Sequence, residues 1–333
     1  MLLSGPMIYL RISVVLFLQL VTQIHAYQLG IEQFELYQHR LQGKKIGFVV
    51  NHTSKINGLK SIDFFKNHHI NIVKLFALEH GTLGNSSNGA IINNSKDPDT
   101  NIEIVSLYQK NKKTISPDDF KGIDLILYDV QDIGVRFYTY VSSLFNIIDA
   151  SIKYQIPLII FDRPNPFLNL VQGPVLKDIY KSFVGKVRVP IVYGMTQGEL
   201  SDFIISEYFP KQSHQITVIE LSNFQRRDGF IFDNIPPSPN LRLLEAINMY
   251  PTLALLEGTE ISIGRGTWSP FTQIGYTDER FGNHTFFPIS LSGLSEDPLH
   301  LGKTCYGENL IETKMIGFDY SLSKKNLWPF PRT

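Results

Sequence analysis

The sequence contains a single cysteine and no surplus of charge of either sign. Cys305 has no second cysteine to pair with, so an internal disulfide is excluded. Lys and Arg together number 31, and Asp and Glu also number 31, which gives a formal net charge of zero at neutral pH. Because proteins that bind nucleic acid need a basic surface, this balance predicts no nucleic-acid partner.

Long hydrophobic runs are also scarce, since one stands near the start of the chain and no second follows. Residues 12–21 are largely apolar, Arg11 precedes them, and Ala26 offers a small residue for cleavage. The run is too short to span a bilayer, so we expect residues 1–26 to be a secretory signal peptide. This predicts a secreted or periplasmic bacterial protein with no stable membrane insertion after cleavage. The weak positive charge at the start leaves an uncleaved anchor as the alternative.

Motifs that bind common cofactors are missing as well. No glycine-rich dinucleotide fingerprint follows the first expected strand, and no phosphate loop is present. The histidines show no metalloprotease spacing with a carboxylate, so we predict neither a metal nor another cofactor. A serine esterase or amidase is disfavoured, because the sequence has no Gly-x-Ser-x-Gly elbow.

What the sequence does contain is an alternation of apolar strands and helical patterns. Strands are expected at 45–50, 70–78, 103–107, 123–130, 157–161 and 216–221, and helices at 30–41, 58–66, 137–154 and 196–209. This pattern predicts an α/β fold, in which a Rossmann-like, mostly parallel sheet carries helices on both faces. We assign it to residues 27–225. The alternation is lost after Arg226, so residues 226–333 are expected to form a smaller α+β subdomain.

Four of the expected strands end in polar side chains. They are Asn51 and His52, then Glu79 and His80, then Asp129, Gln131 and Asp132, and finally Asp162, Arg163 and Asn165. Parallel strands place their carboxyl ends at one edge of a sheet, where ligands bind, so we expect one polar cluster there. Arg136 and Tyr138 follow the central strand and would complete it. The alternative is that Asp129 and Asp132 only cap the next helix.

Carboxyl groups beside a cleft are what glycoside hydrolysis requires, one as an acid and one as a base, nucleophile or charge stabiliser. Glu79 is the preferred acid, because it follows an apolar strand and is partly shielded from water there. Asp132 and Asp162 are candidates for the second role. Glu79 bonding loop amides, and the aspartates merely orienting Arg136 or Arg163, are the structural alternatives. Glu199 fits a capping box and is set aside.

Two further regions are expected to approach this site. The polar segment 82–100 is long for a connection and reads as a loop over the site. In the C-terminal part, the turns that contain Asn240, Glu257 and Arg265 are rich in Pro and Gly. These turns either are plain connectors or bring their side chains against a ligand held by the sheet.

Seven motifs in one order resemble the bacterial exo-β-N-acetylmuramidase family of the NamZ type. They are VNHTS (50–54), ALEHG (77–81), YDVQDIGVRFYTY (128–140), FDRPNP (161–166), YGMTQGEL (193–200), PPSPN (236–240) and LLEGTEISIGRGTWSPF (255–271). The resemblance implies a Rossmann-like catalytic subdomain and an auxiliary subdomain that closes the cleft. It also implies removal, without a cofactor, of terminal N-acetylmuramic acid from the non-reducing end of peptidoglycan fragments. Muramic-acid-containing saccharides are then the partners, and Glu79 is the glutamate of the E-H-G motif.

The sequence departs from the family pattern at three places. Leu83 stands where the family usually has Arg, Gln172 stands where it usually has Glu, and the chain ends earlier, which suggests a truncated C-terminus. These departures motivate an alternative, in which the protein binds muramyl saccharides and has lost the chemistry.

Overall fold

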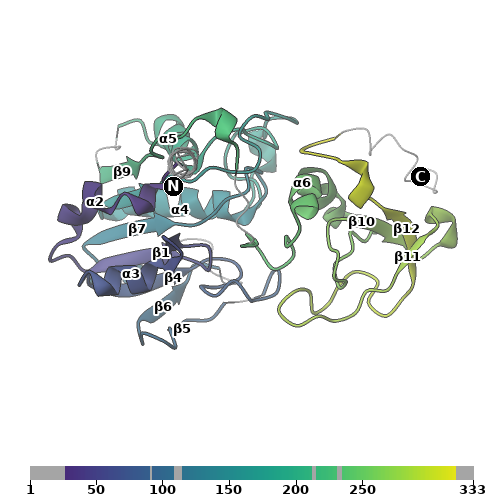
Figure 1. The fold of residues 1–333 in the computed structure, drawn as a ribbon, viewed down its shortest axis with the longest axis horizontal. Helices are drawn as coiled ribbons and strands as arrows, with labels where there is room; N and C mark the ends of the chain where they lie inside the picture. The colour runs from purple at the N-terminus through teal and green to yellow at the C-terminus, as the bar shows by residue number, and fades with distance from the viewer. Residues whose placement is uncertain (1–26, 91, 109–114, 212–214, 231–234, 320–333) are drawn as a thin grey trace, which may run out of the picture.

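The computed structural model describes residues 27–90, 92–108, 115–211, 215–230 and 235–319. The expected signal peptide therefore lies outside the described residues. Two parts can be followed in Figure 1, a large part built on a sheet and a small part that begins with helix α6 (Leu244–Leu253) and lies beyond the sheet. Within the described ranges, no helix combines the length and apolarity needed to cross a bilayer.

The large part contains a seven-stranded sheet in the order β5-β6-β4-β1-β7-β8-β9. The strands are β1 (Ile46–Val50), β4 (Ile72–Ala77), β5 (Ser95–Lys96), β6 (Glu103–Ser106), β7 (Leu125–Asp129), β8 (Leu158–Phe161) and β9 (Ile216–Ile219). All neighbours pair in parallel except β5, which is antiparallel to β6 at one edge. From β6 to β9 this is the Rossmann strand order, which reverses direction between β1 and β7. The predicted parallel sheet is confirmed.

Helices cover both faces of the sheet (Figure 1). They are α2 (Phe34–Leu41), α3 (Ser61–Asn67), α4 (Thr139–Tyr154) and α5 (Gln197–Tyr208). Strand β7 shows the two faces through its alternating side chains. Leu125 and Leu127 pack in the core cluster that holds α2 and α3, whereas Ile126 and Tyr128 pack in the cluster that holds α4 and α5. The apolar run in the sequence therefore reflects a strand buried on both faces.

The beginnings of two helices show how the local sequence determines where a helix starts. Thr196 caps α5 by accepting from the backbone N–H of Glu199 at 3.1 Å, while the Glu199 carboxylate accepts from the N–H of Thr196 at 2.8 Å. The capping role of Glu199 is confirmed. The helix expected from residue 58 is wrong at its start, because a hairpin of β2 (Lys55–Ile56) and β3 (Leu59–Lys60) precedes α3. Asn57 and Gly58 both have positive φ, as a tight Asn-Gly hairpin turn requires.

The small part has a three-stranded antiparallel sheet in the order β10-β12-β11, in addition to α6. Its strands are β10 (Gln273–Tyr276), β11 (His284–Phe286) and β12 (Cys305–Asn309). Short 3-10 helices occur throughout the chain, at η1 (Gly30–Glu32), η2 (Pro117–Phe120), η3 (Asp178–Tyr180), η5 (Arg226–Asp228), η6 (Ala254–Gly258), η7 (Glu279–Phe281) and η8 (Ile311–Thr313). The predicted fold class, with a smaller α+β subdomain after the sheet, is confirmed.

Candidate active site

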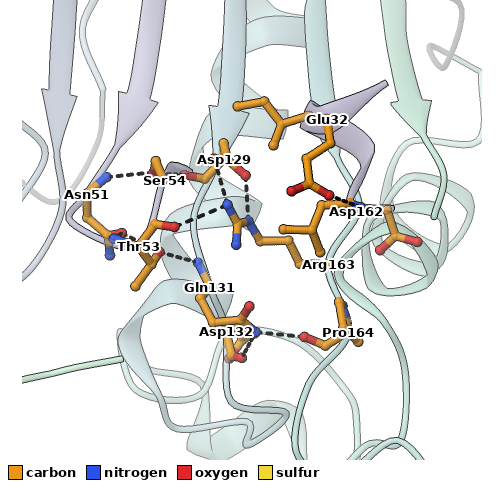
Figure 2. Close-up of polar contacts among 12 residues, drawn as sticks. Glu32, Asn51, Thr53, Ser54, Asp129, Gln131, Asp132, Asp162, Arg163 and Pro164 are labelled. Atoms are coloured by element: carbon orange, nitrogen blue, oxygen red, sulfur yellow. Dashed lines mark hydrogen bonds and ion pairs between the residues drawn. The ribbon is translucent and has the colours of Figure 1, made fainter. Parts of the chain in front are cut away.

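A buried ion pair lies at the carboxyl edge of the sheet, between the ends of β7 and β8. Arg163 donates through Nε to Asp129 Oδ1 at 2.5 Å and through Nη2 to Asp129 Oδ2 at 2.8 Å. The same Nη2 donates to the carbonyl of Thr53, which follows β1, at 3.3 Å. Burial raises the pKa of Asp129 and the guanidinium opposes that shift. The pair therefore ties three strand ends together (Figure 2).

Polar side chains around this pair extend the same network (Figure 2). Asn51 Oδ1 accepts from the Thr53 N–H at 2.9 Å and from the Thr53 hydroxyl at 2.6 Å. The Gln131 N–H donates to Thr53 Oγ1 at 3.1 Å, and Gln131 Nε2 donates to the Pro164 carbonyl at 2.7 Å. Asn165, which is also buried, donates to the Met195 carbonyl. The strand ends therefore meet as expected. Their polar side chains, however, hydrogen-bond to one another and to nearby backbone groups.

Asp132 and Asp162 are each held by the protein itself. Asp132 Oδ1 accepts from the N–H of Ile133 at 2.5 Å, and the Tyr193 hydroxyl donates to Oδ2. Asp162 Oδ1 accepts from the N–H of Gly198, in the first turn of α5, at 2.6 Å. Burial raises the pKa of each carboxyl to about 6. The structure does not bring either one to the cavity that Glu79 lines.

Glu79 lies in a cavity of about 210 Å³ to which both parts of the molecule contribute. From the large part come Glu79, His80, Asn88, Gly89, Tyr108, Phe137, Tyr138, Thr139 and Val184. From the turn after the large part and from the small part come Ser238, Asn240, Leu241, Tyr250, Glu257, Arg265 and Phe271. Five residues expected from the sequence to act at the site therefore share this cavity with Glu79: His80, Tyr138, Asn240, Glu257 and Arg265. The 82–100 loop, which was expected to lie over the site, contributes Asn88 and Gly89.

Both oxygens of the Glu79 carboxylate are held in place. The N–H of Gly89 donates to Oε1 at 3.0 Å, and the hydroxyl of Thr139 donates to Oε2 at 2.6 Å. The Tyr108 hydroxyl also bonds the carboxylate, and burial together with this contact raises the pKa of Tyr108 to about 12. Tyr140 donates to the Glu79 carbonyl at 3.1 Å. The carboxylate is thus oriented in a half-buried position at the end of β4.

The two predicted histidines support the site from different sides. His80 Nδ1 donates to the Ser86 carbonyl at 2.8 Å, and burial lowers the pKa of His80. His52 Nε2 donates to the Pro236 carbonyl at 2.6 Å, and burial lowers the pKa of His52 too. The ring of His52 packs on Gly84, where φ is +64° and an added Cβ would lie 1.9 Å from Nδ1. His52 therefore anchors the turn at 236–240 and does not line the Glu79 cavity.

The small part supplies an arginine with an unused donor. Arg265 Nε donates to Glu257 Oε1 at 2.5 Å, and the guanidinium lies 4.8 Å from the ring centre of Phe271. Arg265 Nη1 is buried and has no hydrogen-bond partner among the described residues. Arg136, by contrast, donates through Nη1 to the carbonyls of Pro174 at 2.7 Å and Val189 at 2.6 Å. Arg136 lines a neighbouring cavity.

Several residues that line the cavity were not identified from the sequence. Thr139, Tyr108 and Tyr250 are among them, although Thr139 stands between two selected tyrosines in the motif at 128–140. Its place in the first turn of α4, beside the carboxyl edge of the sheet, is the signal that identifies it. The described residues contain no group of three or more His, Cys, Asp or Glu arranged to hold a metal ion.

The chain was compared with protein families and solved structures. The family model described as "Exo-beta-N-acetylmuramidase NamZ, N-terminal" matches residues 46–245, and its C-terminal counterpart matches residues 248–321. The chain is 34% identical over 299 residues to Peptidoglycan beta-N-acetylmuramidase NamZ of Bacillus subtilis (strain 168), which covers 85% of this chain and 72% of that relative.

Two crystal structures of DUF1343 family proteins from Bacteroides fragilis are similar to this one. The first has a TM-score of 0.78 and 34% identity, and covers 92% of this chain and 84% of its own. The second has a TM-score of 0.72 and 25% identity, and covers 88% and 79% respectively.

Breaking the buried ion pair should destabilise the protein. Arg163→Met leaves the Asp129 carboxylate buried and unpaired, so we expect the free energy of unfolding to fall by about 3–5 kcal/mol in denaturant titrations. Lys60→Met removes the exposed pair with Asp99 and is the control, with almost no effect expected. Equal effects of the two substitutions would contradict the role given to Arg163.

Stability should also depend on pH through Asp162. Its pKa is about 6 in the folded protein and near its ordinary value of 3.8 in the unfolded chain. The folded state therefore binds the proton more tightly, and this stabilisation is lost as pH rises through 6. Asp162→Asn, which keeps the shape, should reduce the stability difference between pH 5 and pH 7 by about 1 kcal/mol in unfolding measurements. An unchanged difference would show that the pKa of Asp162 is not raised in the folded protein.

Proposed function

Because this chain belongs to the exo-β-N-acetylmuramidase NamZ family, we propose that it removes terminal N-acetylmuramic acid from the non-reducing end of peptidoglycan fragments. The family consists of glycosidases that act on peptidoglycan. The observation that carries the proposal is the carboxylate of Glu79, which is oriented in a cavity lined by both parts of the molecule. We further propose that the protein acts outside the cytoplasm, in accordance with the signal peptide expected at residues 1–26.

Glu79 is the general acid in this proposal. A glycosidic oxygen leaves readily only when a carboxylic acid placed next to it delivers a proton. The bonds from Gly89 and Thr139 fix both oxygens of Glu79, so the side chain is held in one direction before substrate enters. Preorganisation of this kind avoids the cost of ordering the acid during the reaction.

The second role goes to the substrate's own acetamido group. Asp132 and Asp162 were candidates, but Tyr193 and the start of α5 hold their carboxylates. Among the described residues that line the Glu79 cavity, the only other carboxylate is that of Glu257, which is paired with Arg265. The acetamido oxygen attacks the anomeric carbon while the glycosidic oxygen leaves with the proton of Glu79, so the nucleophile need not come from the protein.

Arg265 accounts for the choice of muramic acid. Muramic acid differs from glucosamine by a lactyl group that carries a carboxylate, and a guanidinium binds carboxylates strongly. Glu257 engages Nε of Arg265, so Nη1 is left as a donor without a partner among the described residues. An arginine at position 83 is therefore not required, because Arg265, which lines the cavity, supplies the positive charge.

The alternative of binding without turnover finds no support in the cavity. Leu83 is half exposed on its loop and does not line the cavity. Gln172 Oε1 accepts from the N–H of Phe318 at 2.8 Å, so this side chain holds the C-terminal segment of the described chain. Neither of these two substitutions lines the cavity that contains Glu79, and hydrolysis remains the preferred function.

Replacing Glu79 should abolish most of the activity. Glu79→Gln keeps the size of the side chain but cannot deliver a proton, so release of N-acetylmuramic acid from an unactivated muramyl disaccharide should fall by about 10²–10⁴-fold. Glu199→Gln changes the capping glutamate of α5 and is the matched control. Equal rates for wild type and Glu79→Gln would remove Glu79 from the mechanism. Binding of the saccharide by the wild type without any release would establish the alternative function.

Replacing Arg265 should weaken the preference for muramic acid. Arg265→Lys keeps a positive charge beside Glu257 but removes the planar donor group. We expect kcat/KM for a chromogenic muramide to fall about tenfold, while that for the matching glucosaminide changes little. The ratio of the two values is the measurement. An equal loss on both substrates would mean that Arg265 supports the cavity without recognising the lactyl group.

A further inference from the structure

A second cavity, of about 490 Å³, adjoins the one that contains Glu79. The two cavities share four lining residues, Phe137, Val184, Tyr250 and Glu257. The two cavities are therefore neighbours that share a wall, and the second is the cavity that a molecule extending from Glu79 past these side chains would meet. We call this second cavity the side groove.

Several apolar side chains that line the side groove are exposed to water. Tyr180, at the end of η3, is 67% exposed, and Val184 and Leu255 are 53% and 48% exposed. Exposed aromatic and aliphatic side chains gathered around a hollow are typical of ligand sites. An aromatic face is suited to the C–H face of a sugar ring, and a tyrosine hydroxyl can hydrogen-bond a ligand.

The groove is also lined by two charged residues, Arg136 and Glu257, and Glu257 is paired with Arg265. Arg136 is half-buried in it and uses Nη1 to bond two backbone carbonyls. These bonds fix the guanidinium, and no described residue accepts from its Nε or Nη2. Exposed apolar side chains with a fixed polar donor beside them match an uncharged sugar that bears an amide and hydroxyl groups.

We propose that the side groove binds the sugar on the leaving side of the scissile bond. The inference rests on the proposed function, in which Glu79 protonates the oxygen that joins the terminal muramic acid to the next sugar. That next sugar, an N-acetylhexosamine of the peptidoglycan strand, must extend out of the Glu79 cavity. The wall that the two cavities share through Phe137 and Tyr250 points to the side groove as its place, with Tyr180 as the stacking surface.

A third cavity, of about 250 Å³, is the competing site. It is lined by His52, Pro236 and Arg242, among others, and it shares only Ser238 with the Glu79 cavity. The shared wall is therefore much smaller than that of the side groove. The third cavity also lacks an aromatic face other than the ring of His52, which packs on Gly84.

The test compares two substrates that carry the same muramic acid and differ only in their leaving group. A muramyl–N-acetylglucosamine disaccharide fills both cavities, whereas muramyl fluoride, whose leaving group is one atom, fills only the Glu79 cavity. Tyr180→Ala should lower kcat/KM for the disaccharide about tenfold, mainly through KM, and change that for the fluoride less than about twofold. Ile179→Ala, the matched control, removes a neighbouring side chain that is 80% exposed and outside the groove, and should change neither value.

A binding measurement separates this inference from the proposed function. In the Glu79→Gln protein, calorimetry with the disaccharide should show about tenfold weaker affinity when Tyr180→Ala is added. An unchanged affinity, or a selective loss with Arg242→Ala in place of Tyr180→Ala, would overturn the groove assignment. Failure of the wild type to hydrolyse either substrate would instead contradict the proposed function, and the binding result would still decide the groove.

Discussion

The buried ion pair between Asp129 and Arg163 is the interaction on which the rest of this structure depends. A charged carboxylate without contact with water is stable only when a partner satisfies it, and Arg163 does so through two bonds. Arg163 also reaches the Thr53 carbonyl, and Thr53 is bonded to Asn51. The pair thus connects the strands on either side of the point where the sheet order reverses, which is where Rossmann-like folds place their ligands.

From this pair a chain of hydrogen bonds leads to the candidate acid. Asn51 Nδ2 donates to the hydroxyl of Tyr140 at 3.2 Å, and that hydroxyl donates to the carbonyl of Glu79. The backbone of Glu79 is therefore held by the buried network, while its carboxylate is held by Gly89 and Thr139. The crevice above the sheet is filled by side chains of the protein, and the hollow for a ligand is displaced toward the small part.

The small part and the turn at 236–240 that precedes it complete the site, because several bonds hold them against the sheet edge. His52 bonds the Pro236 carbonyl, and Tyr138 donates to the Pro237 carbonyl at 2.9 Å. Asn240 donates to the Leu294 carbonyl at 2.9 Å, and the N–H of Asn88 reaches the same carbonyl at 3.4 Å. These contacts place the arginine and aromatic residues of the small part opposite Glu79. Because both parts of the molecule line the Glu79 cavity, we expect this cavity to bind a saccharide of defined shape.

The order of strands and helices and the meeting of the strand ends followed from the residues alone, because apolar periodicity and capping are local properties. The choice of Glu79 as the candidate acid also came from the sequence, because it stands at the end of a buried strand, and its catalytic role stays a prediction. The roles of the individual carboxylates could not be predicted from the sequence, since Asp132 and Asp162, like Glu79, stand just after an apolar strand. Burial and bonds to Tyr193 and Gly198 separate them from it. Those partners are distant along the chain, and only folding brings them within hydrogen-bond distance.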